Sequence, residues 1–190
     1  MLPSVLGVRQ GVLDAADRLR AAGHHVLVAD FLAGRTFDEY EPALAHAEGE
    51  LGHGVLMQRA TDAVAEVPDG FALLGFSLGT VMTAHVASLR PVSGVVMVAG
   101  AIPPSAFGDG RTWPAGVPGQ THSTIGDPWR EQELVEATAA EAAGAGAFFD
   151  VFDYPGAGHL FTDASLPDEY DAEATELMWS RVLPFVAGLS

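Results

Sequence analysis

Apolar runs alternate along the chain with segments whose apolar residues recur at helical spacing. Strands are predicted over residues 26–29, 71–74, 95–98, 117–125 and 148–154. Helices are predicted over residues 9–22, 56–67, 78–89 and 171–187, and from Pro128 to about residue 143. This alternation is typical of a compact, mostly parallel sheet flanked by helices. We predict an α/β fold with about six to seven strands and no large cap domain.

The start of the chain departs from this pattern. Residues 3–8 resemble the loop that leaves a strand, yet almost no strand precedes them. Either Met1–Pro3 forms a very short strand, or residues of the domain lie upstream and the first strand is truncated. In both cases we expect Met1–Pro3 beside the strand that ends at Asp30 and the strand that ends at Leu74.

Length, charge and composition limit the number of domains and exclude several classes of function. The 190 residues suit one domain, predicted as residues 1–190. The formal net charge is −16, with nine arginines and no lysine, so the chain lacks the basic face that a nucleic-acid binder needs. No apolar stretch reaches the ~20 residues of a membrane span. The chain has no cysteine, which removes disulfides and a thiol nucleophile.

The sequence also suggests where the protein acts and with which partners. No basic leader precedes the broken apolar start, so we expect a cytoplasmic protein without a membrane or nucleic-acid partner. A monomer or a homodimer is expected.

Gly75-Phe76-Ser77-Leu78-Gly79 matches G-x-S-x-G between a predicted strand and a predicted helix. In that context the serine sits on a strained turn, and the glycines let strand and helix approach closely. The alternative is an ordinary strand-to-helix turn. The motif makes Ser77 the candidate nucleophile.

A serine hydroxyl needs a base, and the base needs an orienting acid. Asp127 and His159 each follow a predicted strand, in the chain order Ser, Asp, His. Loops at the carboxyl ends of strands gather the sites of α/β sheets. We therefore predict a catalytic triad of Ser77, Asp127 and His159.

Alternatives remain for each partner. Asp127 would also suit the N-cap of the following helix, and Asp153 and Asp163 are rival acids. His159 could be a loop histidine without a role. The other histidines are expected in packing or at the surface, and His46 and His53 lack companions at metal spacing, so no metal and no cofactor are expected.

The three loops together resemble the dienelactone hydrolase family of the α/β-hydrolase fold. The resemblance spans nearly the whole chain, and its motifs include Gly75–Gly79, Gly126-Asp127-Pro128-Trp129 and Tyr154-Pro155-Gly156-Ala157-Gly158-His159-Leu160-Phe161. It implies an oxyanion hole formed by the backbone N–H groups of Leu78 and Val5. It also suggests a substrate pocket near Phe76, Leu6, Phe161 and Asp163.

Two departures from the family pattern concern the substrate. Ser77 stands where the enzyme that names the family has a cysteine, and Asp163 stands where that enzyme has an arginine for a substrate carboxylate. The resemblance and the triad lead us to expect a serine hydrolase acting on a small carboxylic ester or lactone, and Asp163 suggests a preference for neutral substrates. A thioesterase or small peptidase on the same triad, or an inactive ligand-binding protein of this fold, is the alternative.

Overall fold

A computed structural model describes residues 1–189, so the last residue of the predicted domain, Ser190, lies outside the described residues. Its sheet has four parallel strands in the order β1-β2-β3-β4. The strands are β1 (Phe71–Phe76), β2 (Val92–Val98), β3 (Gly119–Thr124) and β4 (Phe149–Tyr154). Apolar runs in β1 and β2 are buried, as expected for strands covered on both faces.

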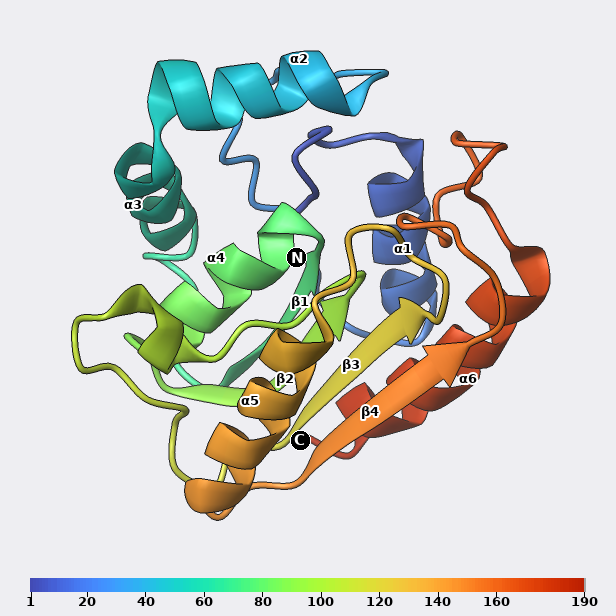
Figure 1. The fold of residues 1–190 in the computed structure, drawn as a ribbon. Coiled ribbons are helices and arrows are strands. Elements are labelled where there is room, and N and C mark those ends of the chain that lie inside the picture. Colours follow the sequence, from blue (N-terminus) through green and yellow to red (C-terminus); the bar gives the residue numbers. More distant parts are fainter. Residues whose placement is uncertain (190) are drawn as a thin grey trace.

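Helices connect and cover these strands (Figure 1). They are α1 (Gln10–Ala21), α2 (Tyr40–Leu44), α3 (His53–Ala63), α4 (Leu78–Ala87), α5 (Gln132–Gly144) and α6 (Ala172–Ala187), with a π-helix η1 (Ala45–Leu51) and a 3₁₀ turn η2 (Pro104–Phe107). The helices α4 and α5 lie on one side of the sheet, and α1 and α6 on the other. The parallel sheet flanked by helices agrees with the sequence prediction.

The strand count is lower than predicted. Residues 24–30 are extended but form no strand, so the strand predicted over residues 26–29 is wrong. Their contact with the neighbouring segment is short: Ala29 N–H donates to the Met1 carbonyl at 2.8 Å, and the Met1 amino group donates to the Leu27 carbonyl at 2.6 Å. Two such bonds do not make a ladder.

Met1–Pro3 lies where the sequence placed it. Leu2 N–H donates to the Leu74 carbonyl at 2.9 Å, and Phe76 N–H donates to the Leu2 carbonyl at 3.1 Å. Leu2 therefore forms a parallel bridge with Gly75 of β1, while Met1 contacts Ala29 on the other side. The loop that follows, including Val5, is held close to the end of β1.

No element was predicted between residues 30 and 55, and residues 40–51 of that segment fold as α2 and η1. In Figure 1 these helices lie across the carboxyl end of the sheet, above the start of α4. Ala43 of α2 and Ala47 of η1 are fully buried and anchor these helices to the core. This short helical layer covers the edge of the sheet at which the three candidate residues gather.

Candidate active site

The turn from β1 into α4 has the strained geometry that G-x-S-x-G implies. Ser77 has φ 49° and ψ −115°, a left-handed conformation that is costly for a residue with a side chain. A Cβ on Gly75 would lie closer than 3.0 Å to the backbone of Gly79, and one on Gly79 would meet the carbonyls of Leu2 and Pro3. Only glycine permits this approach, and the turn presents Ser77 at the start of α4.

Ser77, His159 and Asp127 form one hydrogen-bonded chain. His159 Nε2 lies 2.7 Å from Ser77 Oγ, and His159 Nδ1 lies 2.7 Å from Asp127 Oδ2. Asp127 and His159 are each only 6% exposed, so water competes little for these bonds. Residues 50 and 32 positions apart in the sequence therefore meet in the geometry of a nucleophile, a base and an orienting acid.

The rival acids lie elsewhere. Asp153 Oδ1 accepts a hydrogen bond from Arg130 at 2.7 Å on the edge strand β4. Asp163 accepts hydrogen bonds from the Ser165 N–H and hydroxyl. Asp127 is not the N-cap of α5, because that helix begins at Gln132. Instead, Asp127 Oδ1 accepts a hydrogen bond from the Trp129 N–H at 2.8 Å, which fixes the carboxylate toward His159.

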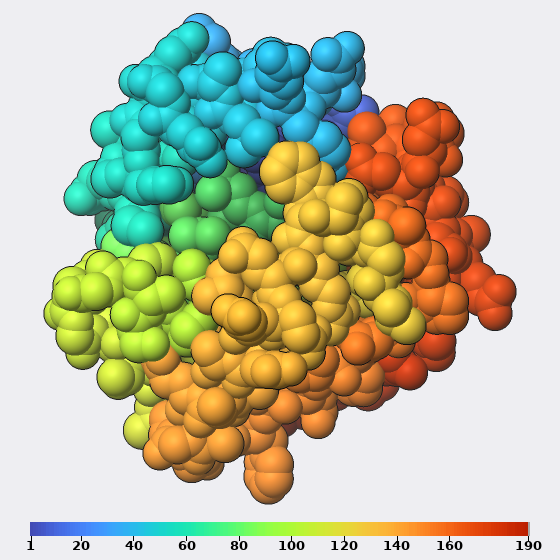
Figure 2. Space-filling model, in the orientation of Figure 1, coloured from blue at the N-terminus to red at the C-terminus, as the bar shows by residue number. Residues whose placement is uncertain are grey.

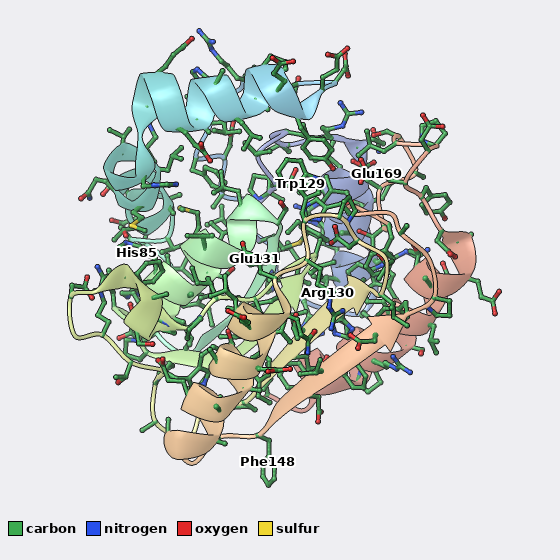
Figure 3. All side chains as sticks on the ribbon, in the orientation of Figure 1. His85, Trp129, Arg130, Glu131, Phe148 and Glu169 are labelled. Atoms are coloured by element: carbon green, nitrogen blue, oxygen red, sulfur yellow. The ribbon has the colours of Figure 1, made fainter. Side chains whose placement is uncertain are left out.

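Two residues that the sequence did not indicate hold the loop of His159. Glu169 Oε2 accepts a bond from Leu160 N–H at 2.7 Å, and its carboxylate accepts a bond from the Tyr40 hydroxyl at 2.9 Å. Burial and the neighbouring Glu169 raise the pKa of Tyr40 far above its usual value, so the hydroxyl stays protonated and donates. Tyr40 contacts both Trp129 and Glu169, which are labelled in Figure 3: its ring centroid lies 5.7 Å from that of Trp129, and its hydroxyl donates to Glu169.

Aromatic rings complete the wall around the imidazole. The ring centroid of Tyr40 lies 6.0 Å from that of His159, and the centroid of Trp129 lies 6.1 Å from it. Trp129 belongs to a quoted motif, but Tyr40 comes from α2, 119 positions before His159 in the chain. No local pattern signals such a partner.

The two residues expected to supply the oxyanion hole, Val5 and Leu78, line the same hollow. Leu78 is the first residue of α4, where an N–H has no carbonyl partner within the helix. In the loop after Pro3, Leu6 N–H donates to Ser4 Oγ and Gly7 N–H donates to the Ser4 carbonyl, whereas no hydrogen bond from Val5 N–H occurs within residues 1–189. Both Val5 and Leu78 line the hollow beside Ser77.

That hollow, the Ser77 cavity, has a volume of about 210 Å³ and is lined by Val5, His159 and residues from the segments 40–44, 77–81, 99–102 and 129–134. Figure 2 shows α4 in green at the bottom of a depression between the light-blue α2 segment and the yellow-orange segment around Trp129. Most of its walls are apolar. Such a hollow suits a small substrate.

The four residues expected in the substrate pocket, Leu6, Phe76, Phe161 and Asp163, do not line this cavity. Leu6, Phe76 and Phe161 are core residues with at most 3% exposure. Asp163 turns toward α1, where it fills the space that a Cβ of Gly11 would need and lies 3.6 Å from Arg9 Nε. Its carboxylate is thus committed to α1 and the Ser165 turn.

Three of the other six histidines have structural partners. His122 Nδ1 lies 2.8 Å from the Tyr154 hydroxyl, His85 Nδ1 lies 2.7 Å from Arg111, and His46 Nδ1 lies 2.7 Å from Glu50. Among residues 1–189, no three His, Asp or Glu side chains form a cluster that could hold a metal ion. No helix in the same range has the length and apolar character to cross a membrane.

Comparison with known proteins places this architecture. A crystal structure of a dienelactone hydrolase-like promiscuous phosphotriesterase from metagenomic libraries superposes with a TM-score of 0.82 at 22% identity, covering 99% of this chain and 84% of that one. Mouse alpha/beta hydrolase domain-containing protein 10 gives 0.68 at 14% identity, covering 100% and 89%. The RedJ thioesterase of the prodiginine biosynthetic pathway in Streptomyces coelicolor gives 0.59 at 16% identity, covering 100% and 84%.

These similarities, all below 25% identity, show the α/β-hydrolase fold. A search of curated protein sequences found no match. The model of the dienelactone hydrolase family matches residues 1–189, which is nearly the whole chain. The chain therefore belongs to the dienelactone hydrolase family, a family of hydrolases.

Proposed function

We propose that this hydrolase cleaves small carboxylic esters or lactones through an acyl-serine intermediate. The observation that carries the proposal is the continuous hydrogen-bonded chain from Ser77 Oγ through His159 to Asp127, with 2.7 Å at both links. A serine hydroxyl held this way can pass its proton to the imidazole while it attacks a carbonyl.

The reaction proceeds in two halves. Ser77 Oγ bonds to the carbonyl carbon as its proton moves to His159 Nε2, and the carbonyl oxygen becomes an oxyanion beside the Val5 and Leu78 N–H groups. The carbon–oxygen bond to the alcohol then breaks, and His159 gives its proton to the departing alkoxide. Water then adds to the acyl carbon as its proton moves to His159 Nε2, which forms a second tetrahedral intermediate. When this intermediate collapses, the bond from carbon to Ser77 Oγ breaks, His159 returns the proton to Oγ, and the carboxylic acid is released.

Each neighbour of the imidazole has a role in this proposal. Asp127 stabilises the imidazolium and keeps Nδ1 protonated, and Trp129 N–H fixes the Asp127 carboxylate. Two preorganised N–H donors stabilise the oxyanion, and loss of one such donor typically costs about 3–4 kcal/mol in the barrier. All of these groups belong to the protein.

The test is hydrolysis of a panel of neutral substrates by the wild-type chain and by Ser77→Ala. We expect wild type to prefer short p-nitrophenyl esters and lactones, and to react with a fluorophosphonate probe. Ser77→Ala should lose both activities, by a factor of at least about 10³ for hydrolysis, with unchanged thermal unfolding. Turnover of a thioester, a peptide or a neutral phosphotriester but of no carboxylic ester would reassign the substrate class; near wild-type turnover in Ser77→Ala would remove Ser77 from the mechanism.

A further inference from the structure

One acidic side chain lines the otherwise mostly apolar Ser77 cavity at a place where the triad does not use it. Glu131 lies on the cavity wall together with Trp129, Leu134 and the triad residues Ser77 and His159. Figure 3 shows it at the start of α5, below Trp129 in that view. The cavity that contains Ser77 therefore has a carboxylate residue on its wall.

The fold gives Glu131 no other task. It is the N-cap residue of α5, but its side chain makes no capping hydrogen bond; only its backbone carbonyl accepts bonds, from Leu134 and Val135. Across residues 1–189 its carboxylate has no ion pair, and Arg130 next to it is bound to Asp153 and Gln132 instead. Glu131 is exposed to solvent and also lines the cavity, so its carboxylate is free to meet a bound substrate.

No positive side chain balances this charge at the cavity. None of the arginines lines it in the described part of the chain. Those with acidic partners in other parts of the molecule include Arg9, Arg35 and Arg111, which pair with Asp38, Glu50 and Asp109. The net charge of −16 adds a weak field of the same sign.

Two aromatic residues line the same cavity as Glu131. Trp129 lines the cavity and is 51% exposed, and the centroid of the Tyr40 ring lies 5.7 Å from that of Trp129. Aromatic faces and a carboxylate together attract an ammonium group, above all a quaternary one that cannot be held by ordinary hydrogen bonds. The same surroundings repel a carboxylate on the substrate.

We propose that Glu131 is a specificity-determining residue that makes the site prefer esters bearing an ammonium group over neutral isosteres, and neutral esters over anionic ones. This inference rests on the proposed ester hydrolysis. From the sequence, Asp163 was expected to disfavour anionic substrates. Because the Asp163 carboxylate faces α1, we assign this discrimination to Glu131. The charge selectivity arises at the start of α5 instead.

The experiment compares three acetate esters of similar size: acetylcholine, its neutral isostere 3,3-dimethylbutyl acetate, and an acetate whose alcohol carries a carboxylate. They are assayed with wild type, Glu131→Gln and the matched control Glu133→Gln. Glu133 lies in the first turn of the same helix, is exposed, and does not line the cavity. Both variants change the net charge equally, so any difference between their rate ratios reflects the position of the lost carboxylate.

For wild type at low salt we expect kcat/KM to favour the cationic ester over its isostere by about three- to tenfold, as for opposite charges that meet at a partly screened site. Glu131→Gln should bring this ratio close to one and speed hydrolysis of the anionic ester, whereas Glu133→Gln should leave the ratios unchanged. Salt at 1 M should shrink the wild-type ratio. Equal ratios in wild type and Glu131→Gln, or equal losses in both variants, would overturn the inference.

A binding measurement separates this inference from the proposed function. Tetramethylammonium binding, followed by tryptophan fluorescence, should weaken by a similar factor in Glu131→Gln and not in Glu133→Gln. If wild type hydrolyses none of the three esters, the proposed function fails while this binding difference still decides the role of Glu131. Hydrolysis of all three without any Glu131 dependence of rate or binding would leave ester hydrolysis standing and remove the charge selection.

Discussion

At the scale of single residues, the side chains that the sequence identified are those carried by local motifs. Ser77 follows from the two glycines that its turn requires, and Asp127 and His159 from their positions after strands. Tyr40 and Glu169 were missed because they meet only in the folded chain, 129 positions apart. Asp163 was misplaced because the sequence gives its distance from His159 along the chain and not its direction.

The assignment of the acid is tested with a pair of isosteric changes. Asp127→Asn should lower kcat/KM by about 10²–10⁴, because an amide cannot stabilise the imidazolium and favours the wrong tautomer of His159. Asp153→Asn, which removes only the contact with Arg130 on β4, should change kcat/KM less than about threefold. Steady-state kinetics on one neutral ester suffices. A larger loss in Asp153→Asn than in Asp127→Asn would refute the assignment.

Tyr40 and Glu169 act as positioning residues for His159. Tyr40→Phe keeps the ring beside the imidazole but removes the hydroxyl that holds Glu169, which in turn binds Leu160 N–H. A hydrogen bond to a charged group contributes about 1.5–3 kcal/mol to stability. Because its loss acts on His159 only through the loop, we expect a smaller effect on the reaction: kcat should fall about three- to tenfold with KM nearly unchanged. The neighbouring Tyr170→Phe, with an exposed side chain, is the control. An unchanged kcat in Tyr40→Phe would show that the loop is held without this contact.

At the scale of elements, the sequence predicted the long periodic helices and the strands β1 to β4 because each has a strong local pattern. It overcounted strands at residues 26–29, because this apolar run shares only two hydrogen bonds with the neighbouring Met1 and forms no ladder. It gave no prediction for α2 and η1, because a five-residue helix followed by a π-helix has no sustained period. Those short elements supply Tyr40 and Leu44 to the Ser77 cavity.

The junction of β1 and α4 is the element most sensitive to volume. Gly75→Ala would place a Cβ closer than 3.0 Å to the Gly79 backbone, which cannot move without disturbing Ser77. We expect a loss of about 1–3 kcal/mol in the free energy of unfolding and a large loss of activity. Gly54→Ala in α3 meets open space and should stabilise by up to about 1 kcal/mol. Urea denaturation of both variants gives the comparison, and similar midpoints would contradict the close packing described for Gly75.

At the scale of the whole molecule, acid pH brings two opposing effects. The net charge of −16 falls toward zero as the pH approaches the pI of about 4.5, which relieves self-repulsion and favours the folded state. His122 opposes this. It is fully buried between the Tyr154 hydroxyl and the Gln120 side-chain oxygen, and burial, helped by the charge of Arg181, lowers its pKa to about 3.

The sign of the His122 contribution follows from proton binding. Between about pH 6.5 and pH 3 the unfolded chain binds a proton at this histidine and the folded chain does not, so stability is lost as the pH falls through that window. The slope approaches about 1.4 kcal/mol per pH unit from this one group. His122→Gln should remove this part of the slope, even though losing the imidazole costs stability at neutral pH.

The measurement is the free energy of unfolding by urea from pH 7.5 to pH 4.5 for wild type, His122→Gln and the exposed control His25→Gln. Because carboxylate titration and self-repulsion are nearly the same in all three proteins, the difference between their slopes isolates the buried imidazole. Wild type and His25→Gln should lose stability in parallel relative to His122→Gln below about pH 6.5. Parallel curves for wild type and His122→Gln would mean that His122 accepts a proton in the folded protein, which would require water or a carboxylate to reach it.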